Sequence, residues 1–250
     1  MAPDFPDCRV HPSPNFGDRS ADLALDMLIL HYTGMPNGQG AESWLTNPAS
    51  QVSSHYLVHE SGEIVQMVIE EKRAWHAGKS CWSGLSDLNS ASIGIEIVNP
   101  GHEFGYRAFP DQQIAAVIAL CQDILRRHKI SSQRILAHSD IAPARKEDPG
   151  ELFPWAQLHA HGIGHWVPES SRAGGQFLTV GDRGDSVAAF QGLLALYGYC
   201  IDPSGEFDEQ TRLVTVAFQR HFRPSRVDGI ADIGTIDTLH ALLRDLPPGA

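Results

Sequence analysis

The sequence contains no long apolar run and no excess of positive charge. Its 250 residues include no uninterrupted stretch of about 20 apolar side chains, the length that a membrane-spanning helix requires. Lys and Arg total 19 while Asp and Glu total 30, which gives a formal net charge of -11 at pH 7. Proteins that bind the phosphate backbone of nucleic acids usually present a basic face. We therefore expect a chain that neither spans a membrane nor acts generally on nucleic acid.

Cysteine is also scarce. The four cysteines are widely spaced and form no Cys-x-x-Cys pair: Cys8, Cys81, Cys121 and Cys200. Small domains that depend on disulfides carry denser cysteine patterns. The spacing therefore predicts reduced, partly buried thiols rather than a disulfide scaffold.

A segment without periodic apolar residues divides the chain. Residues 168–175 read PESSRAGG, and a stretch so rich in Pro, Ser and Gly is typical of a linker. We therefore expect a first domain over residues 1–167, a linker over residues 168–176 and a second domain over residues 177–250.

The first domain has the pattern of a mixed α/β fold. Apolar or β-rich runs predict strands at residues 28–30, 54–58, 63–69, 92–98 and 134–137. The second and third of these flank Ser61-Gly62, which predicts a hairpin. Residues 111–128 carry apolar side chains at helical spacing, with Asp111 as the expected cap.

The second domain has the pattern of three short helices. AAFQGLL at 188–194 and VAFQRHF at 216–222 form a weak internal repeat, with each Phe-Gln pair inside an amphipathic pattern. Turn signals rich in Gly and Asp separate the segments. We expect the three helices to pack around one small core.

Two histidines follow short apolar runs, where rigid strands would present them at a common edge. His31 follows residues 28–30, and His138 follows residues 134–137. A hydrolytic zinc site takes three protein ligands and leaves one position for water. Asp148 lies in a turn-rich segment that could fold back to the same metal, while Asp140 is a rival that points the same way as His138 on an extended chain.

Four motifs occur in order: HYTG (31–34), AWHAG (74–78), SIGIEIVN (92–99) and HSDIAPARKEDPG (138–150). Together they resemble the N-acetylmuramoyl-L-alanine amidases of the AmpD and AmiD type. The resemblance implies a mixed central sheet flanked by helices, as in peptidoglycan-recognition folds. It also implies one Zn²⁺ per chain, bound by His31, His138 and Asp148. Asp140 would then either support the ligands without touching the metal or cap a helix. The implied reaction is hydrolysis of the amide bond between N-acetylmuramic acid, or its anhydro form, and L-alanine in peptidoglycan or muropeptides.

The resemblance further implies that Glu96 and Lys146 are catalytic. Glu96 lies in an otherwise apolar strand, where a carboxylate is costly unless it is partnered or functional. There it would take a proton from the zinc-bound water and pass it to the leaving amine. Lys146 would stabilise the oxyanion. A structural carboxylate and a solvated lysine are the alternatives.

Four further residues are expected to contact the substrate. Trp75 and His76 would wall the groove, as the resemblance suggests, and Arg145 would attract the carboxylates of the stem peptide. His55 would line the cleft. Packing for Trp75, a solvated Arg145 and a hydrogen-bonded strand histidine for His55 are the alternatives.

The C-terminal sequence resembles the three-helix peptidoglycan-binding domain that is attached to wall hydrolases. The match over residues 177–243 rests on recurring Gly, Phe-Gln and Asp-Gly positions, and a helical domain for dimerisation or stability is the alternative. Two other functions remain open: a recognition protein that binds without cutting, and a zinc peptidase acting within the stem peptide. Asp148 with Glu96 and Lys146 favours catalysis over the first, and the 138–150 motif argues against the second.

Location is inferred from two opposing features. The first 20 residues lack the basic start and apolar core of a secretory signal, which favours the cytoplasm. A wall-binding module favours export. The alternative is a periplasmic or outer-membrane-associated protein whose leader has been removed.

Overall fold

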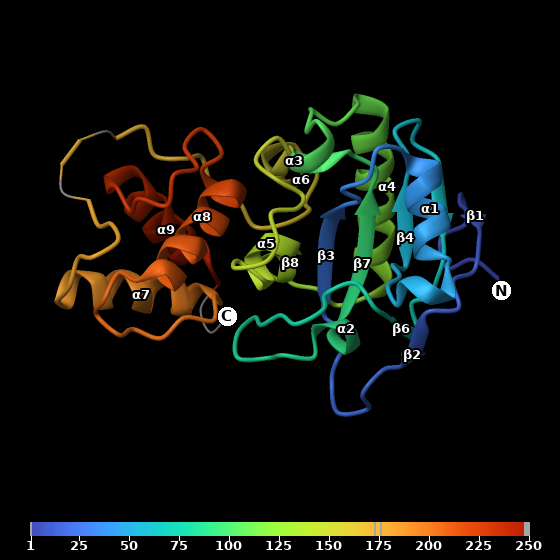
Figure 1. Cartoon of the computed structure of the whole chain (residues 1–250), viewed down its shortest axis with the longest axis horizontal. Coiled ribbons are helices and arrows are strands. Elements are labelled where there is room, and N and C mark those ends of the chain that lie inside the picture. Colours follow the sequence, from blue (N-terminus) through green and yellow to red (C-terminus); the bar gives the residue numbers. More distant parts are fainter. Residues whose placement is uncertain (1, 173, 176, 248–250) are drawn as a thin grey trace.

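The larger part of the molecule is built around a mixed β-sheet. The computed structural model describes residues 2–172, 174–175 and 177–247, and its six-stranded sheet has the order β1-β5-β4-β7-β3-β8 (Figure 1). Neighbouring strands are parallel except in the β4–β5 hairpin, so the expected hairpin is confirmed. The strands are β1 (Arg9–Val10), β3 (Met27–Tyr32), β4 (Tyr56–Val58), β5 (Ile64–Gln66), β7 (Ser92–Ile97) and β8 (Ile135–Ala137). A separate antiparallel pair joins β2 (Phe16–Asp18) to β6 (Lys72–Ala74).

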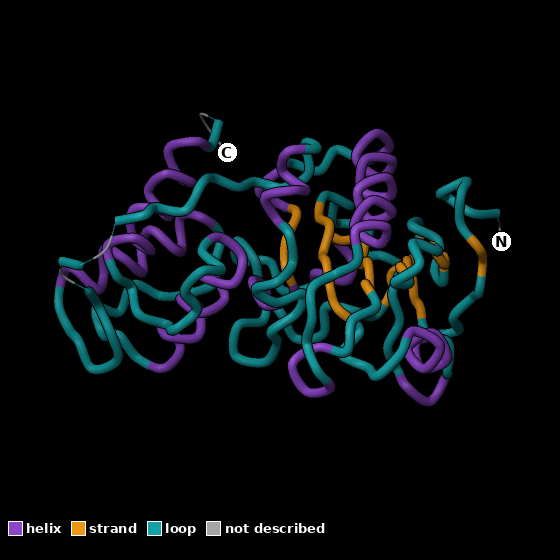
Figure 2. The backbone as a smooth tube through the Cα atoms, turned by 90° about the horizontal axis from the view of Figure 1, so that it is seen from above, coloured by secondary structure: helices purple, strands orange, loops and turns teal. Residues whose placement is uncertain are grey.

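Helices cover both faces of this sheet. α4 (Asp111–Arg127) packs its apolar side chains on one face, and its cap is Pro110 rather than the expected Asp111. α1 (Gly38–Leu45) covers the other face, where Leu45 packs with Leu57 of β4. Seen from above, the strands lie between these two helices (Figure 2). The expected mixed sheet flanked by helices is therefore confirmed.

Alternation along β3 and β7 decides which side chains face away from α4. Leu28 and Leu30 of β3, like Ile95 of β7, belong to the core beneath α4. Because successive strand residues point to opposite faces, His31 and Glu96 project from the other side of the sheet. The two residues are also register partners in the parallel β3–β7 pair. The alternation of side chains along each strand and the β3–β7 register together place these polar side chains next to each other.

Shorter segments complete the first part of the chain. They are η1 (Pro48–Ser50), α2 (Leu88–Ala91), α3 (Gly101–Phe104), η2 (Ser132–Arg134), α5 (His138–Ile141) and α6 (Trp155–Ala160). Of the expected linker over residues 168–176, residues 173 and 176 lie outside the described residues. Within the described part of the chain, no helix combines the length and the apolar character that crossing a membrane requires.

The described residues after the expected linker form three helices, as the sequence predicts. They are α7 (Asp185–Tyr197), α8 (Glu209–Phe222) and α9 (Ile233–Asp245). Gln191 and Gln219, the glutamines of the Phe-Gln repeat, are buried in α7 and α8. Each uses both side-chain polar atoms to bond the loop that leads to the next helix. The repeat therefore has a structural reason: each glutamine fixes one interhelical loop.

The two parts share one apolar core. Trp82 and Ile141 from the first part lie in the same buried cluster as Leu194 and Phe218 from the second. Figure 1 shows α7, α8 and α9 beside the β8 edge of the sheet. The helical part is therefore packed against the sheet domain as well as joined to it through the chain.

A disulfide crosses the same boundary. Cys81 and Cys200 are bonded, with their Cα atoms 5.9 Å apart, while Cys8 and Cys121 are free. The prediction of reduced thiols is therefore wrong for the bonded pair. Local spacing could not reveal this bond, because 119 residues separate the two cysteines and only the packing of the two parts brings them together.

Candidate metal centre and active site

Three ligand-type side chains converge at one edge of the sheet. His31 lies near the end of β3, His138 begins α5 directly after β8, and Asp148 follows in the next loop. His31 Nδ1 and His138 Nδ1 are 2.9 Å apart, and Asp148 Oδ2 lies 3.1 and 3.0 Å from these two nitrogens. All three residues are buried. The structure therefore brings together the three expected ligands, whereas Asp140 is not among them.

The far side of His31 fixes which ring nitrogen carries its proton. His31 Nε2 lies 3.0 Å from His76 Nδ1, and His76 Nε2 lies 3.2 Å from Ser92 Oγ. The Ser92 hydroxyl donates to the Leu88 carbonyl, so its oxygen accepts from His76 Nε2. The Nδ1 of a neutral His76 then accepts from His31 Nε2. This chain leaves His31 Nδ1 as a bare lone pair facing the other two ligands.

A backbone contact also favours the tautomer of His138 in which Nδ1 carries no proton. Its Nε2 donates to the Ala77 carbonyl oxygen at 3.2 Å, so the Nδ1 of the neutral ring carries no proton. Burial, together with the neighbouring His138, lowers the pKa of His31 to about 4. For Asp148, burial alone would raise the pKa, but His138 and His31 beside it hold the pKa below its usual range.

With both histidines neutral in these tautomers, two imidazole lone pairs and the Asp148 carboxylate face one another across hydrogen-bond distances. Such a cluster of acceptors is costly when buried unless a cation lies between them. Two nitrogens with one oxygen is also a donor set that hydrolytic metal sites use. The residues therefore fit a bound metal ion.

Glu96 lies beside this cluster. Its Oε2 is buried, and it has no hydrogen-bond partner among the residues that the structure describes. Burial raises the pKa of Glu96 well above its ordinary value, and the negative charge of Asp148 raises it further, while Lys146 opposes both. A carboxylate whose pKa is raised is a stronger base than an ordinary one, and it can exchange a proton with a reacting group.

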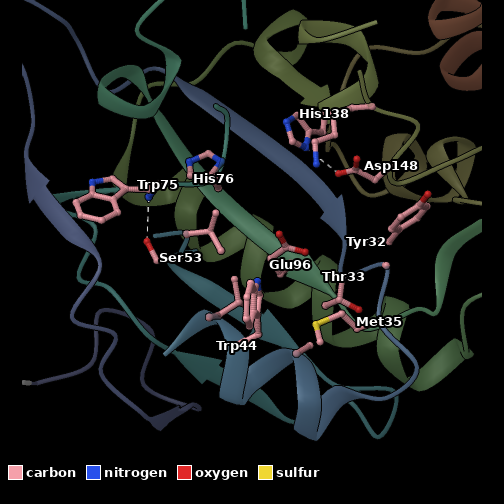
Figure 3. Close-up of a pocket in the computed structure, with 15 residues that line it drawn as sticks. Tyr32, Thr33, Met35, Trp44, Ser53, Trp75, His76, Glu96, His138 and Asp148 are labelled. Atoms are coloured by element: carbon pink, nitrogen blue, oxygen red, sulfur yellow. Dashed lines mark hydrogen bonds and ion pairs between the residues drawn. The ribbon is translucent and has the colours of Figure 1, made fainter. Parts of the chain in front are cut away.

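His138, Asp148 and Glu96 line a cleft of about 310 Å³. Figure 3 shows Glu96 between the His138–Asp148 pair and Trp44. Lys146 and the expected Trp75 and His76 also line this cleft. The remaining lining residues are Tyr32, Thr33, Gly34, Met35, Ala41, Leu45, Val52 and Ser53. The cleft therefore combines a charged end with apolar and aromatic walls.

Two expected substrate contacts lie elsewhere. His55 is fully buried: its Nδ1 accepts from Gly94 N, and its Nε2 lies 2.9 Å from an Arg19 nitrogen. Arg145 is exposed outside the cleft, and its guanidinium donates to the carbonyls of Ala77 and Lys79. These contacts match a hydrogen-bonded His55 and an Arg145 that fixes the segment holding His138.

Some contributors to the site have no sequence signal of their own. Trp44 and Val52 line the cleft from the α1 region and are about half and a third exposed, at 48% and 37%. Asn89 fixes the AWHAG segment, because its Oδ1 accepts from the backbone N–H groups of His76 and Ala77. No local pattern marks these residues, since their roles depend on neighbours distant in sequence.

The fold and the site together define a hydrolase-type centre able to hold a metal ion. The family model described as N-acetylmuramoyl-L-alanine amidase matches residues 21–151, and a peptidoglycan binding domain model matches residues 183–239. The chain is 41% identical over 235 residues to the N-acetylmuramoyl-L-alanine amidase AmiD of Escherichia coli, covering 88% of this chain and 83% of AmiD. It is 33% identical over 171 residues to the 1,6-anhydro-N-acetylmuramyl-L-alanine amidase AmpD of Enterobacter cloacae, covering 62% of this chain and 89% of AmpD.

Solved structures agree with these matches. AmiD from E. coli, in complex with the substrate anhydro-N-acetylmuramic acid-L-Ala-D-gamma-Glu-L-Lys, aligns with a TM-score of 0.75 and 37% identity, covering 92% of this chain and 97% of that chain. AmpDh3 from Pseudomonas aeruginosa aligns with a TM-score of 0.73 and 30% identity, covering 99% of each chain. The chain therefore belongs to the N-acetylmuramoyl-L-alanine amidase family, and the expected resemblance is confirmed.

Proposed function

We propose that this protein uses one Zn²⁺, held by His31, His138 and Asp148, to cut the bond between N-acetylmuramic acid, or its anhydro form, and L-alanine. The observation that carries the proposal is the buried cluster of two bare imidazole nitrogens and a carboxylate beside Glu96. The AmiD complex with an anhydromuramoyl tripeptide supports a muropeptide substrate. The match of residues 183–239 to a peptidoglycan binding domain supports action on the polymer as well.

Each residue has a chemical role in this proposal. Zn²⁺, when bound, supplies a Lewis acid that polarises the amide carbonyl and acidifies water. Glu96 takes a proton from the attacking water and delivers it to the leaving amine of L-alanine, a role that its raised pKa supports. Lys146, which lines the same cleft, stabilises the negative charge that develops on the amide oxygen. Trp75 offers an aromatic wall to the sugar or the stem peptide.

The disulfide supports one of the two expected locations. Disulfides form and persist in oxidising compartments and are rare in the bacterial cytosol. A bond between Cys81 and Cys200 therefore favours the periplasmic or outer-membrane-associated alternative over the cytoplasm. An exported enzyme would also have a use for a domain that holds it on peptidoglycan.

A digestion experiment tests the proposed reaction. The full chain is incubated with a defined anhydromuramoyl peptide and with intact sacculi, with and without a chelator, and products are identified by mass spectrometry. We expect free peptides that begin with L-alanine, loss of the activity on chelation and recovery with Zn²⁺. Asp148→Asn, which keeps the size of a ligand and removes its charge, serves as the metal-deficient control.

The same experiment separates the alternatives. Cleavage confined to the stem peptide would indicate a peptidase, and binding to sacculi without peptide release would indicate a recognition protein. Full activity after complete removal of zinc would contradict the proposed metal chemistry.

A further inference from the structure

Asp140 is a buried carboxylate directly behind the proposed metal ligands. It lies in α5, two residues after His138, and is 1% exposed. Its Oδ2 accepts from Ala137 N at 2.8 Å and lies 2.7 Å from His221 Nδ1. Its Oδ1 accepts from the Tyr199 hydroxyl at 2.7 Å. Two of these three partners come from the C-terminal helical part of the chain.

We propose that Asp140 is a positioning residue for His138, and that Tyr199 and His221 hold Asp140 in place. The helical part then belongs to the framework of the metal centre, in addition to any binding of peptidoglycan. This inference rests on the proposed function, because it assigns a role in holding Zn²⁺ to residues that do not touch the metal.

Asp140 holds the short helix that carries His138. α5 has four residues, and a single helical turn is too short to be stable by itself. Asp140 bonds the backbone N–H of Ala137, the residue immediately before His138, and so closes the first turn of α5. The end of that turn is closed by the bond from Ala142 N to the His138 carbonyl. The direction of the His138 ring therefore depends on the placement of Asp140.

The helical part, in turn, holds Asp140 through His221 and Tyr199. His221 of α8 lies between two aromatic rings, with centroid distances of 3.8 Å to Trp155 and 3.8 Å to Phe222. Tyr199 packs edge-on against Trp82 at 4.9 Å. Because both donors are fixed by packing, the Asp140 carboxylate has one preferred position. Two charge-assisted hydrogen bonds then tie α5 to the helical part.

A second contact from α8 reaches the other end of residues 138–148, the segment that carries the proposed ligands His138 and Asp148. Arg220 pairs with Glu147 at 3.1 Å, and Glu147 lies between Lys146 and Asp148 in the sequence. The two ends of the segment are also joined directly, since Ser139 N donates to the Asp148 carbonyl at 3.0 Å. α8 therefore contacts the segment that carries two of the three ligands near both of those ligands.

The test compares two buried tyrosine hydroxyls of the same helical part. Tyr199→Phe removes a bond to Asp140, whereas Tyr197→Phe removes a bond to His165 Nδ1 at 2.9 Å. The tyrosines are 2% and 1% exposed, so both variants lose one buried hydroxyl from a packed core. For each full-length variant, the dissociation constant for Zn²⁺ is measured by chelator competition. The visible spectrum of the Co²⁺ form, the melting temperature, kcat and KM are recorded alongside.

We expect both variants to melt at a similarly lowered temperature. Tyr199→Phe alone should bind Zn²⁺ about tenfold more weakly, the lower end of what outer hydrogen-bond partners of ligands contribute. It should also shift the Co²⁺ absorption bands and lower kcat at an unchanged KM. Asp140→Asn should have the same effects, and combining it with Tyr199→Phe should add little, because both changes act through one carboxylate.

Equal zinc affinity and equal Co²⁺ spectra for Tyr199→Phe and Tyr197→Phe would overturn the inference. Additive effects in the double variant would overturn it too. If Tyr199→Phe does not fold, Asp140→Asn is compared with Tyr197→Phe by the same measurements, and equal zinc affinity would again overturn the inference. A wild-type chain that binds Zn²⁺ but releases no L-alanine peptide would contradict the proposed function, while the affinity comparison would still decide the role of Asp140.

Discussion

Glu96 shows how the surroundings of a single residue shift the pKa of its side chain. The carboxylate projects from β7 at the register position of His31, next to Asp148 and at the wall of the cleft. A strand that packs apolar residues on its other face holds this side chain in one place. The burial that makes the charged form costly is also what prepares the group to accept and release a proton.

Glu96→Gln should abolish most turnover without removing the metal. We expect kcat to fall by about 10²–10⁴-fold, the usual contribution of a general base. Zinc content, measured by plasma mass spectrometry, should stay at the wild-type level because Glu96 is not among the three ligands. Glu71→Gln, at an exposed glutamate outside the cleft, is the control and should keep full activity. A Glu96→Gln enzyme with wild-type kcat would mean that another group acts as the base.

The sequence motifs predict the proposed ligands but not the contacts that orient them. His31, His138 and Asp148 stand in motifs with a fixed order, so the motifs alone point to them. The bond from His31 to His76 has no such signal, because it links two strand-end segments 45 residues apart. His76 is expected from the sequence as a wall of the groove, and the structure gives it this bond to His31 as well.

Among the elements, β7 approaches His76 closely, and His76 in turn contacts His31. Gly94 lies in β7 beneath the His76 ring, and a Cβ added there would meet three ring atoms at 2.4 to 2.6 Å. Only a residue without a side chain leaves room for the ring at this position. The glycine in SIGIEIV therefore has a packing reason that is connected to the site.

Gly94→Ala should displace His76 and loosen the hold on His31. We expect a loss of stability of about 1–3 kcal/mol from overpacking, together with weaker zinc binding. Gly192→Ala in α7 is the control: a Cβ there meets no heavy atom within 4 Å in the described structure, so this change should stabilise the helix by about 1 kcal/mol. Thermal unfolding and chelator competition measure both effects. A Gly94→Ala protein with unchanged zinc affinity would contradict the proposed link.

Elements with a clear apolar pattern are predictable from this sequence, and a single turn without such a pattern is not. The buried strands and α4 have clear periodicity, so their types and approximate positions follow from the sequence. α5 has a single turn and begins at the proposed ligand His138, so no period marks it. Its existence depends on Asp140 and on partners that lie 59 and 81 residues away in the sequence.

At the scale of the whole molecule, the two parts behave as one packed unit. Their common core and the Cys81–Cys200 bond have no signature in the sequence, because both are products of docking between distant segments. The linker-like composition of residues 168–175 instead predicts two separate domains. Composition indicates whether a segment can form a flexible linker, but it does not indicate how the parts that the segment joins pack together.

Thiol counting tests the disulfide. Denatured protein that has not been reduced should react with a maleimide reagent at two positions, Cys8 and Cys121. After reduction, all four cysteines should react, and each added label is counted by intact-mass spectrometry. Cells producing the protein should yield the two-label form if it resides in an oxidising compartment. Four labels without reductant, in protein purified under oxidising conditions, would contradict the bond.

The covalent link between residues 81 and 200 spans the segment over 168–176. A protease that cut the chain there, for example after the exposed Arg172, would produce two polypeptides that remain a single molecule. The shared core would keep them docked, and Tyr199 and His221 would keep their contacts with Asp140. Proteolysis alone would therefore leave the helical part attached, and separation would require reduction of the disulfide and disruption of the core.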